Sequence, residues 1–142
     1  MSDRFILFND EQIDAQQIMM LTDLAKLLLE DPNVKVSFQK FQHYDPINNT
    51  CNVSFTWLHR PEHIINAGLK SDIMLDTLGF KHTDPAIYKE VLDESFDHMS
   101  FFKQLFMLIE EYRLSNLIMV KRPVTKKLFK HRLNVKIKQN NS

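Results

Sequence analysis

Apolar residues recur every three or four positions along most of the chain, the spacing that places side chains on one face of a helix. The first such stretch predicts a helix within residues 13–29, with Asn9 or Asp10 as its N-cap. Pro32 ends this helix, because the residue before a proline avoids the helical conformation. The apolar stripe of this helix consists of Ile18, Leu21, Ala25 and Leu28.

Alternation of apolar and polar residues predicts strands in the first half of the chain. Residues 5–8 form a short apolar run that suits an edge strand. Residues 34–39 and 51–57 both alternate, and the stretch between them is rich in turn-forming residues. We expect these two runs to pair as an antiparallel hairpin. Their inward-facing residues are Val34, Val36 and Phe38, and then Cys51, Val53, Phe55 and Trp57.

Helical spacing returns after Trp57 and continues to the end of the chain. Four further helices are expected, and Gly68 is a possible break in the first of them, which Gly79 would cap at its C-terminus. Asp84 is expected as the N-cap of the second. These helices are predicted over residues 62–78, 84–93, 97–121 and 125–134. The sequence therefore predicts a helix-dominated α+β domain over residues 1–137, with a β-hairpin packed against four or five helices and a frayed tail at 138–142.

The helix predicted over 97–121 is so rich in apolar residues that we expect it at the centre of the fold. Arg113 lies between Ile109 and Leu117 in its apolar stripe. A buried charge needs a partner, and Glu110 is three residues away on the same side of the helix. We therefore expect Arg113 to be buried, paired with Glu110 and able to orient neighbouring loops. The alternative is an exposed contact site.

Charge is distributed unevenly, although eighteen basic and eighteen acidic residues balance over the whole chain. Residues 1–120 carry a net charge of −8, and residues 121–142 carry +8. Such a basic arm suits an acidic surface on its own body, another protein or nucleic acid. We expect it to fold back as a helix, with Leu128, Phe129 and Leu133 buried. Its predicted contact residues are Arg122, Lys126 and Lys127.

Composition excludes several classes of function. Two glycines are too few for the phosphate-binding loops of nucleotide-binding proteins, and no cofactor is expected. A single cysteine forms no disulfide within the chain and fits a reducing compartment. No apolar run approaches the ~20 residues that span a bilayer, so we expect a cytoplasmic location and no contact with membranes.

Metal-dependent chemistry has little support in the spacing of potential ligands. Cys51, His59 and His63 would supply three ligands, but no paired-ligand motif accompanies them. A degenerate metallohydrolase-like domain built on these residues remains an alternative. A nucleic-acid-binding module that uses the basic 121–138 segment is another, although few aromatic residues accompany those charges.

Three stretches, 69–79, 102–114 and 121–132, occur in an order that resembles a known group of proteins. They resemble the N-terminal region of nitric-oxide reductase activation proteins, which are large proteins with a von Willebrand factor A (VWA) domain related to the cobalt-chelatase VWA subunit. Residues 4–9 and 21–25 fit the Gram-positive branch of that group. The most specific part is an acidic residue and an arginine on a helix, followed by Arg-Pro-x-Thr.

Several residues match the motifs of this group. Glu110 and Arg113 match its Glu-Asp-x-Arg helix, and Glu111 stands in place of the aspartate. Arg122, Pro123 and Thr125 match its Arg-Pro-Gly-Thr turn, but Val124 replaces the glycine. Because valine disfavours positive φ, this substitution changes the expected geometry of the turn. The candidate structural and interaction residues are Glu110, Arg113, Arg122, Pro123, Thr125, Lys126 and Lys127.

The resemblance implies a non-enzymatic protein-interaction domain. It would belong to a co-chaperone that acts with a MoxR-type AAA+ ATPase in the assembly or activation of metalloenzymes. The implied partners are that ATPase and the protein's own C-terminal VWA domain, whose Asp-x-Ser-x-Ser motif does not occur in these residues. On this basis we expect protein partners rather than nucleic acid.

Overall fold

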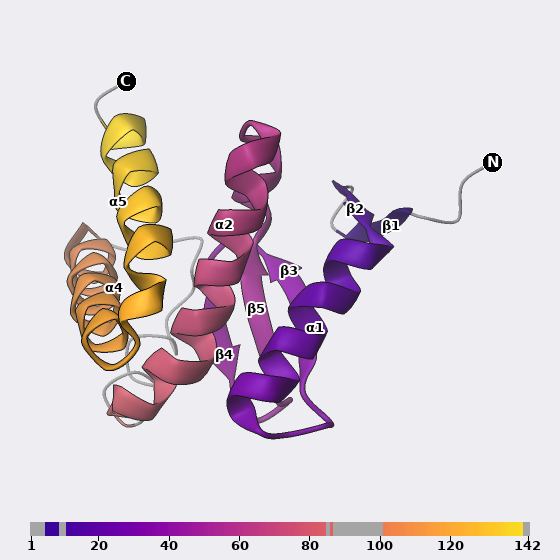
Figure 1. The fold of residues 1–142 in the computed structure, drawn as a ribbon, viewed down its shortest axis with the longest axis horizontal. Coiled ribbons are helices and arrows are strands. Elements are labelled where there is room, and N and C mark those ends of the chain that lie inside the picture. The colour runs from indigo at the N-terminus through magenta and orange to yellow at the C-terminus, as the bar shows by residue number, and fades with distance from the viewer. Residues whose placement is uncertain (1–4, 9–10, 85, 87–100, 141–142) are drawn as a thin grey trace.

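A computed structural model describes residues 5–8, 11–84, 86 and 101–140 (Figure 1). The described strands all lie before residue 55, with one long helix among them, and helices follow, as the change of apolar spacing after Trp57 predicts. The strands are β1 (Phe5–Phe8), β2 (Glu11–Asp14), β3 (Lys35–Gln39), β4 (His43–Asp45) and β5 (Thr50–Ser54). The α-helices are α1 (Ala15–Leu29), α2 (Glu62–Met74), α4 (Phe101–Lys121) and α5 (Lys126–Asn140). A helix-dominated α+β fold is confirmed.

The central sheet has three strands in the order β3-β5-β4. An antiparallel hairpin is present, but it consists of β4 and β5, with His43 opposite Asn52. The predicted pairing of residues 34–39 with 51–57 was wrong in direction, because β3 runs parallel to β5, with Phe38 beside Val53. The short strand β4, within the stretch expected to be a turn, supplies the antiparallel neighbour.

The strand that includes Cys51 ends earlier than its alternation predicts. After Ser54 the chain forms a 3₁₀ turn, Phe55–His59, instead of continuing the strand. The Ser54 hydroxyl caps this turn by accepting a hydrogen bond from the Thr56 N–H at 3.3 Å. The turn carries Trp57 into the core, where 5% of its surface is exposed.

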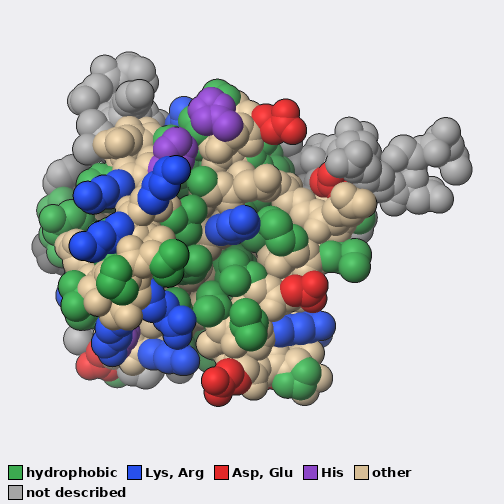
Figure 2. Space-filling view, viewed as in Figure 1, with side chains coloured by type: hydrophobic (Ala, Val, Ile, Leu, Met, Phe, Trp, Pro, Cys, Tyr) green, Lys and Arg blue, Asp and Glu red, His purple; other side chains and the backbone are tan. Residues whose placement is uncertain are grey.

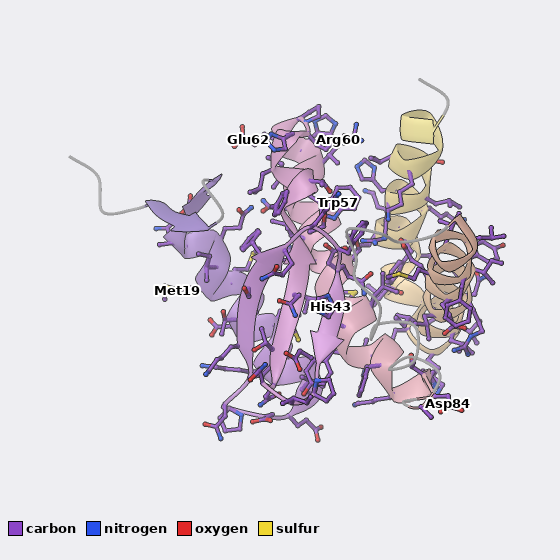
Figure 3. The ribbon with its side chains drawn as sticks, turned by 180° about the vertical axis from the view of Figure 1, so that it is seen from behind. Met19, His43, Trp57, Arg60, Glu62 and Asp84 are labelled. Atoms are coloured by element: carbon purple, nitrogen blue, oxygen red, sulfur yellow. The ribbon has the colours of Figure 1, made fainter. Side chains whose placement is uncertain are left out.

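Helices α1 and α2 cover one face of the central sheet, and Figure 3 shows the sheet from its other side, in front of them. The core between these layers contains Leu21, Ala25, Val34, Phe38, Cys51, Val53, Leu69 and Ile73. Asp14 caps α1 by accepting a hydrogen bond from the Gln16 N–H at 2.9 Å. This corrects the expected caps, Asn9 and Asp10, which lie outside the described residues.

The second half of α2, from Gly68 to Ile73, is largely buried, and the helix continues through Gly68 without a break. A Cβ at Gly68 would lie 2.2 Å from Trp57 Cδ2, so the indole packs directly on the helix backbone. The helix continues as a π-turn, Leu75–Gly79, and a 3₁₀ turn, Phe80–His82. Gly79 does not cap it: its φ of −67° is helical, and the Leu114 side chain packs against it.

Helices α4 and α5 lie together at one end of the molecule, beside α2 (Figure 1). The prediction that the long apolar helix occupies the centre was wrong. Leu114 and Ile118 of α4 are buried, whereas Leu105, Leu108, Ile109 and Tyr112 are exposed. In helix α5, Val135 belongs to the core cluster that includes Leu69 and Ile73 of α2, and Phe129 belongs to the cluster that includes Leu114 and Ile118 of α4. The helix runs to Asn140, so residues 138–140 are helical rather than a frayed tail.

Two further expectations concern the helix predicted over 84–93 and the absence of a membrane span. The helix predicted over 84–93 lies almost wholly outside the described residues, although Asp84 accepts a hydrogen bond from the Ala86 N–H at 2.9 Å, as an N-cap does. Among the described residues, no helix combines the length and the apolar character needed to cross a membrane.

Candidate functional site

The predicted pair between Glu110 and Arg113 forms, but it forms at the surface. Arg113 Nε and Nη2 donate to the two Glu110 carboxylate oxygens at 2.7 and 2.8 Å. Arg113 is 44% exposed, so the expected burial was wrong: this part of α4 faces outward. Arg113 Nη2 also donates to the His82 carbonyl at 2.9 Å. The pair therefore orients the segment that follows the π-turn, and hydrogen bonding to Glu110 raises the pKa of Arg113.

The Arg122-Pro123-Val124-Thr125 motif forms the corner between α4 and α5. Pro123–Thr125 is a 3₁₀ turn, in which the Thr125 N–H donates to the Arg122 carbonyl at 2.9 Å. The Thr125 hydroxyl is buried and donates to the same carbonyl at 2.7 Å. Among the described residues, only Glu30 and Asn49 have positive φ. Val124 therefore has negative φ, and the corner forms without the conformation that glycine favours.

The expected contact residues of the basic arm point away from the body of the domain. Arg122, Lys126 and Lys127 are all exposed. Leu133, expected in the core, is 45% exposed and Leu128 is half-buried, whereas Phe129 is buried as predicted. The contacts with acidic residues are made instead by Arg132 and Lys136, which lie about one and two turns beyond Phe129 on α5.

Arg132 is a buried cation, and it joins three helices. Its guanidinium is 4% exposed. Nη1 donates to the Asp72 carboxylate and, at 2.6 Å, to the Ser71 hydroxyl of α2, and Nε donates to Glu111 of α4 at 2.6 Å. The guanidinium also lies over the Trp57 ring, 5.3 Å from its centroid. Lys136 Nζ donates to the second Glu111 oxygen at 3.2 Å.

The Asp72 carboxylate binds both the end of β5 and the indole of Trp57. Its Oδ2 accepts hydrogen bonds from the Ser54 N–H at 2.8 Å and from Trp57 Nε1 at 3.1 Å. Complete burial raises the pKa of Asp72, while the Arg132 charge and these donors act in the opposite direction. Because every partner of this carboxyl group is a donor, we assign it the ionised form, paired with Arg132.

Glu111 responds differently because it has two cationic partners and is less deeply buried. Burial opposes its ionisation, but the charges of Arg132 and Lys136 together outweigh it and lower the pKa of Glu111 to about 2. Asp72, Glu111, Arg132 and Lys136 thus form a neutral network that fixes α5 against α2 and α4. We call these four residues the buried charge network.

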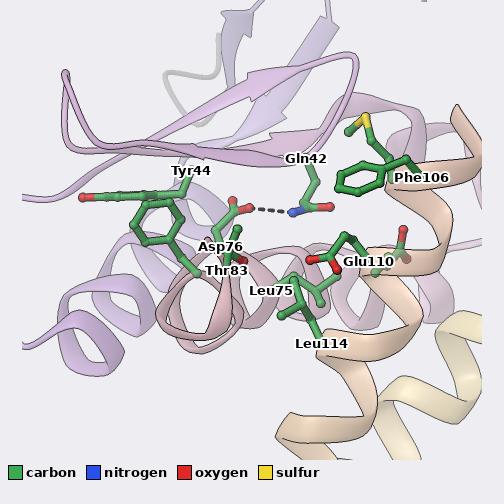
Figure 4. A pocket seen from close by; sticks show the side chains of 11 residues that line it. Gln42, Tyr44, Leu75, Asp76, Thr83, Phe106, Glu110 and Leu114 are labelled. Carbon is green, nitrogen blue, oxygen red and sulfur yellow. Dashed lines mark hydrogen bonds between the residues drawn. The ribbon is translucent and has the colours of Figure 1, made fainter. Parts of the chain in front are cut away.

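A pocket lies between the sheet, the π-turn and α4 (Figure 4). Gln42, Tyr44, Phe106 and Glu110 line it, together with Asp76 of the π-turn. Asp76 is 1% exposed; its Oδ1 accepts a hydrogen bond from Gln42 Nε2 at 2.9 Å, and its Oδ2 has no hydrogen-bond partner. Burial raises the pKa of Asp76 well above its ordinary value, which favours the protonated acid.

The metal ligands considered from the sequence do not form a site. Among the described residues, no three His, Cys, Asp or Glu side chains are grouped to hold a metal ion. Cys51 is fully buried in β5, and burial raises the pKa of its thiol, whereas His59 and His63 are exposed. Phe38 and Trp57 belong to the core, so neither ring is available to stack on a base.

The buried charge network was missing from the sequence-based candidates, although a signal for Arg132 was present. Arg132 lies between Phe129 and Val135, three residues from each, so it shares the apolar stripe of its helix. The same argument was applied to Arg113, where it failed. Nothing in the local pattern distinguishes the two arginines, because only the position of α2 brings Asp72 to one of them.

Comparison with known proteins places the chain beside a much longer protein. It is 38% identical over 132 residues to the uncharacterized protein YojO of Bacillus subtilis, and the match covers 91% of this chain. The chain spans about one fifth of the length of that relative. No family model matches the chain. No solved structure matches it either.

Proposed function

We propose that this domain is a non-enzymatic protein-interaction domain. It would be the N-terminal part of a longer VWA-type co-chaperone that acts with a MoxR-type AAA+ ATPase in metalloenzyme assembly or activation. The observation that carries the proposal is an apolar stripe on the outer side of α4. The co-chaperone role comes from the resemblance in the 69–79, 102–114 and 121–132 stretches.

The stripe has the spacing of a helix face that normally packs against protein. Its members are three, four and seven residues apart, so they form one continuous strip along α4. Their exposed fractions are 41% for Leu105, 48% for Leu108, 57% for Ile109 and 60% for Tyr112. Large apolar side chains that gather on one exposed face indicate a contact with another protein surface. We call these four residues the α4 stripe.

The occupant we favour is the remainder of the longer protein. The relative extends for about four fifths of its length beyond the matched segment, which is enough chain for further domains. An intramolecular partner is present at high effective concentration, so a modest apolar contact is sufficient to hold it. The Arg113–Glu110 pair next to the stripe would hold this surface in a fixed position relative to the segment that follows the π-turn.

The test is co-elution of this chain with two purified probes. One is the part of YojO outside the match, and the other is a MoxR-type ATPase with ATP. We expect a complex with at least one of them, and we expect Ile109→Asp to abolish it by placing a charge in the stripe. Ile47→Asp is the matched control, because Ile47 is 88% exposed on the β4–β5 turn, in another part of the fold.

The outcome separates the proposal from its alternatives. Equal loss of binding in the Ile109 and Ile47 variants would remove the α4 stripe as the interface. Absence of a complex with both probes, while the chain remains folded, would reject the co-chaperone role. Tight binding to an arbitrary DNA duplex with a steep dependence on salt would instead favour the nucleic-acid-binding alternative.

A further inference from the structure

The corner between α4 and α5 carries a second exposed surface, separate in composition from the α4 stripe. Five basic residues lie there within ten positions of the chain, and all are exposed: Lys121, Arg122, Lys126, Lys127 and Lys130. Figure 2 shows Lys and Arg side chains gathered on the side of the molecule where α4 and α5 lie. We call these five residues the basic corner.

Within the part of the chain that the structure describes, no carboxylate pairs with the basic corner. The acidic partners of α5, Asp72 and Glu111, are both occupied by Arg132 and Lys136. Lys126 and Lys130 are four residues apart on α5, so they lie on one side of the helix, and both are exposed. The contacts of α5 with the body therefore leave the basic corner facing solvent.

The position of these charges in the helix is unfavourable for the folded domain alone. Lys126 and Lys127 begin α5, whose first turn has no acidic residue. The N-terminus of a helix carries partial positive charge, so cations there destabilise the helix slightly. A cluster that weakens its own helix is more easily explained by an anionic partner than by stability.

Two exposed valines favour an acidic protein over nucleic acid as that partner. Val120 is 77% exposed and Val124 is 89% exposed, and both lie among the charges of the corner. Branched aliphatic side chains gain by contact with apolar side chains, whereas single-stranded nucleic acids are held by aromatic stacking. We propose that the basic corner, with Val120 and Val124, binds an acidic protein segment that also carries apolar residues.

The proposal is tested with three labelled probes and fluorescence anisotropy. They are a short peptide of Glu and Asp with interspersed Leu, the same peptide with Ser in place of Leu, and a DNA duplex. We expect the Leu-containing peptide to bind tightest, because it satisfies both the charges and the valines. Added salt should weaken it, since exposed charges are screened.

Two matched variants complete the test. The Arg122→Ala, Lys126→Ala, Lys127→Ala variant should lose affinity for the Leu-containing peptide by about tenfold to a hundredfold, since each exposed charge contact contributes up to about 1 kcal/mol. The Lys26→Ala, Lys35→Ala, Lys40→Ala variant removes the same charge elsewhere and should bind as the unmodified chain does. The first variant should also be as stable as the unmodified chain or slightly more so, because cations leave the start of α5.

Three results would overturn the proposal. The first is a DNA duplex that binds as tightly as the Leu-containing peptide. The second is equal affinity of the Leu and Ser peptides, which would leave no role for the valines. The third is equal loss of affinity in both variants, which would reduce the interaction to net charge. None of these results bears on the α4 stripe, so this inference and the proposed function fail independently.

Discussion

Arg113 and Arg132 show how the contribution of a charged side chain to stability depends on its surroundings. Arg113 makes three hydrogen bonds at the surface, where solvent screens the pair and its side chain is 44% exposed. Arg132 makes its contacts in a closed interior, 4% exposed. Removing a partner from a buried pair leaves an uncompensated charge behind, and this cost has no counterpart at the surface.

We predict that Arg132→Ala lowers the free energy of unfolding by about 3–5 kcal/mol, because Asp72 then remains buried and ionised without its cation. Arg113→Ala should lower it by less than about 1 kcal/mol. Urea unfolding followed by the fluorescence of Trp57, which is the single tryptophan of the chain, measures both. Equal losses in the two variants would contradict the assignment of Arg132 as the buried charge.

Gly68 offers a second prediction at a single position. Glycine inside a helix is usually improved by alanine, by about 1 kcal/mol. At Gly68 the added methyl group would lie 2.2 Å from the Trp57 ring, so Gly68→Ala should instead destabilise the domain, by about 1–3 kcal/mol or more. The fluorescence emission maximum of Trp57 should shift, because its indole is displaced.

Gly79→Ala is the control for that substitution. Gly79 has a helical φ of −67°, and a Cβ there would lie 3.4 Å from Leu114 Cδ1, which is an ordinary contact. We expect this variant to be at least as stable as the unmodified chain. If Gly68→Ala proved equally harmless in the same unfolding measurement, direct packing of Trp57 on α2 would be wrong.

At the scale of elements, α5 depends on the body of the domain more than on its own sequence. Its first turn carries lysines, and Phe129 and Val135 are the apolar side chains of α5 that the structure describes as buried. Isolated helices shorter than about 12–15 residues are marginal in water even for good helix formers, so packing on α2 and α4 must supply most of the stability of this 15-residue helix. The buried charge network supplies the direction of that packing, because it allows only one position of α5 along α2 and α4.

We predict that backbone amides around Phe129 and Arg132 exchange slowly with deuterium in the intact chain. In Arg132→Ala they should exchange much faster, while amides of α2 around Leu69 keep most of their protection. Hydrogen exchange resolved by NMR or mass spectrometry tests this. Loss of protection in both helices together would mean that α5 and α2 unfold as one unit, contrary to the prediction.

At the scale of the whole molecule, two carboxyl groups give stability opposite dependences on pH. The pKa of Glu111 in the folded protein is about 2, below its ordinary value of 4.5. The stability that it contributes is therefore present above pH 4.5 and is lost as the pH falls towards 2. Asp76 has a raised pKa, so the folded state binds its proton more tightly and loses stability as the pH rises above 3.8.

We predict that stability is highest in mildly acidic solution and declines on both sides. Asp76→Asn should remove much of the decline at higher pH, because the amide keeps a hydrogen bond with Gln42 and has no charge to bury. Glu111→Gln should flatten the decline at low pH and lower stability at neutral pH. Unfolding midpoints measured across the pH range test both variants. An Asp76→Asn profile that overlays the unmodified one would show that Asp76 does not carry this effect.

The α+β class, the helices α1, α2, α4 and α5, and the positions of β1, β3 and β5 could be predicted from the sequence. Each depends on local hydrogen bonding and on which face of one element is apolar, and apolar spacing records both. The unequal charge of the two parts of the chain likewise predicted a basic helix folded back on the body, but it did not indicate that Arg132 and Lys136 make the acidic contacts. The Glu110–Arg113 pair was predictable for the same local reason, since its members are three residues apart on one helix.

Tertiary structure alone decided which elements are neighbours. β3 and β5 have the same alternation whether they run parallel or antiparallel, and their direction depends on β4, which lies in a stretch that resembles a turn. Arg113 and Arg132 occupy equivalent places in their helical stripes, but only Arg132 meets Asp72, sixty residues earlier in the chain. A sequence pattern shows that a side chain faces inward; the partner that it meets there depends on residues too far away in the chain for any local pattern to record.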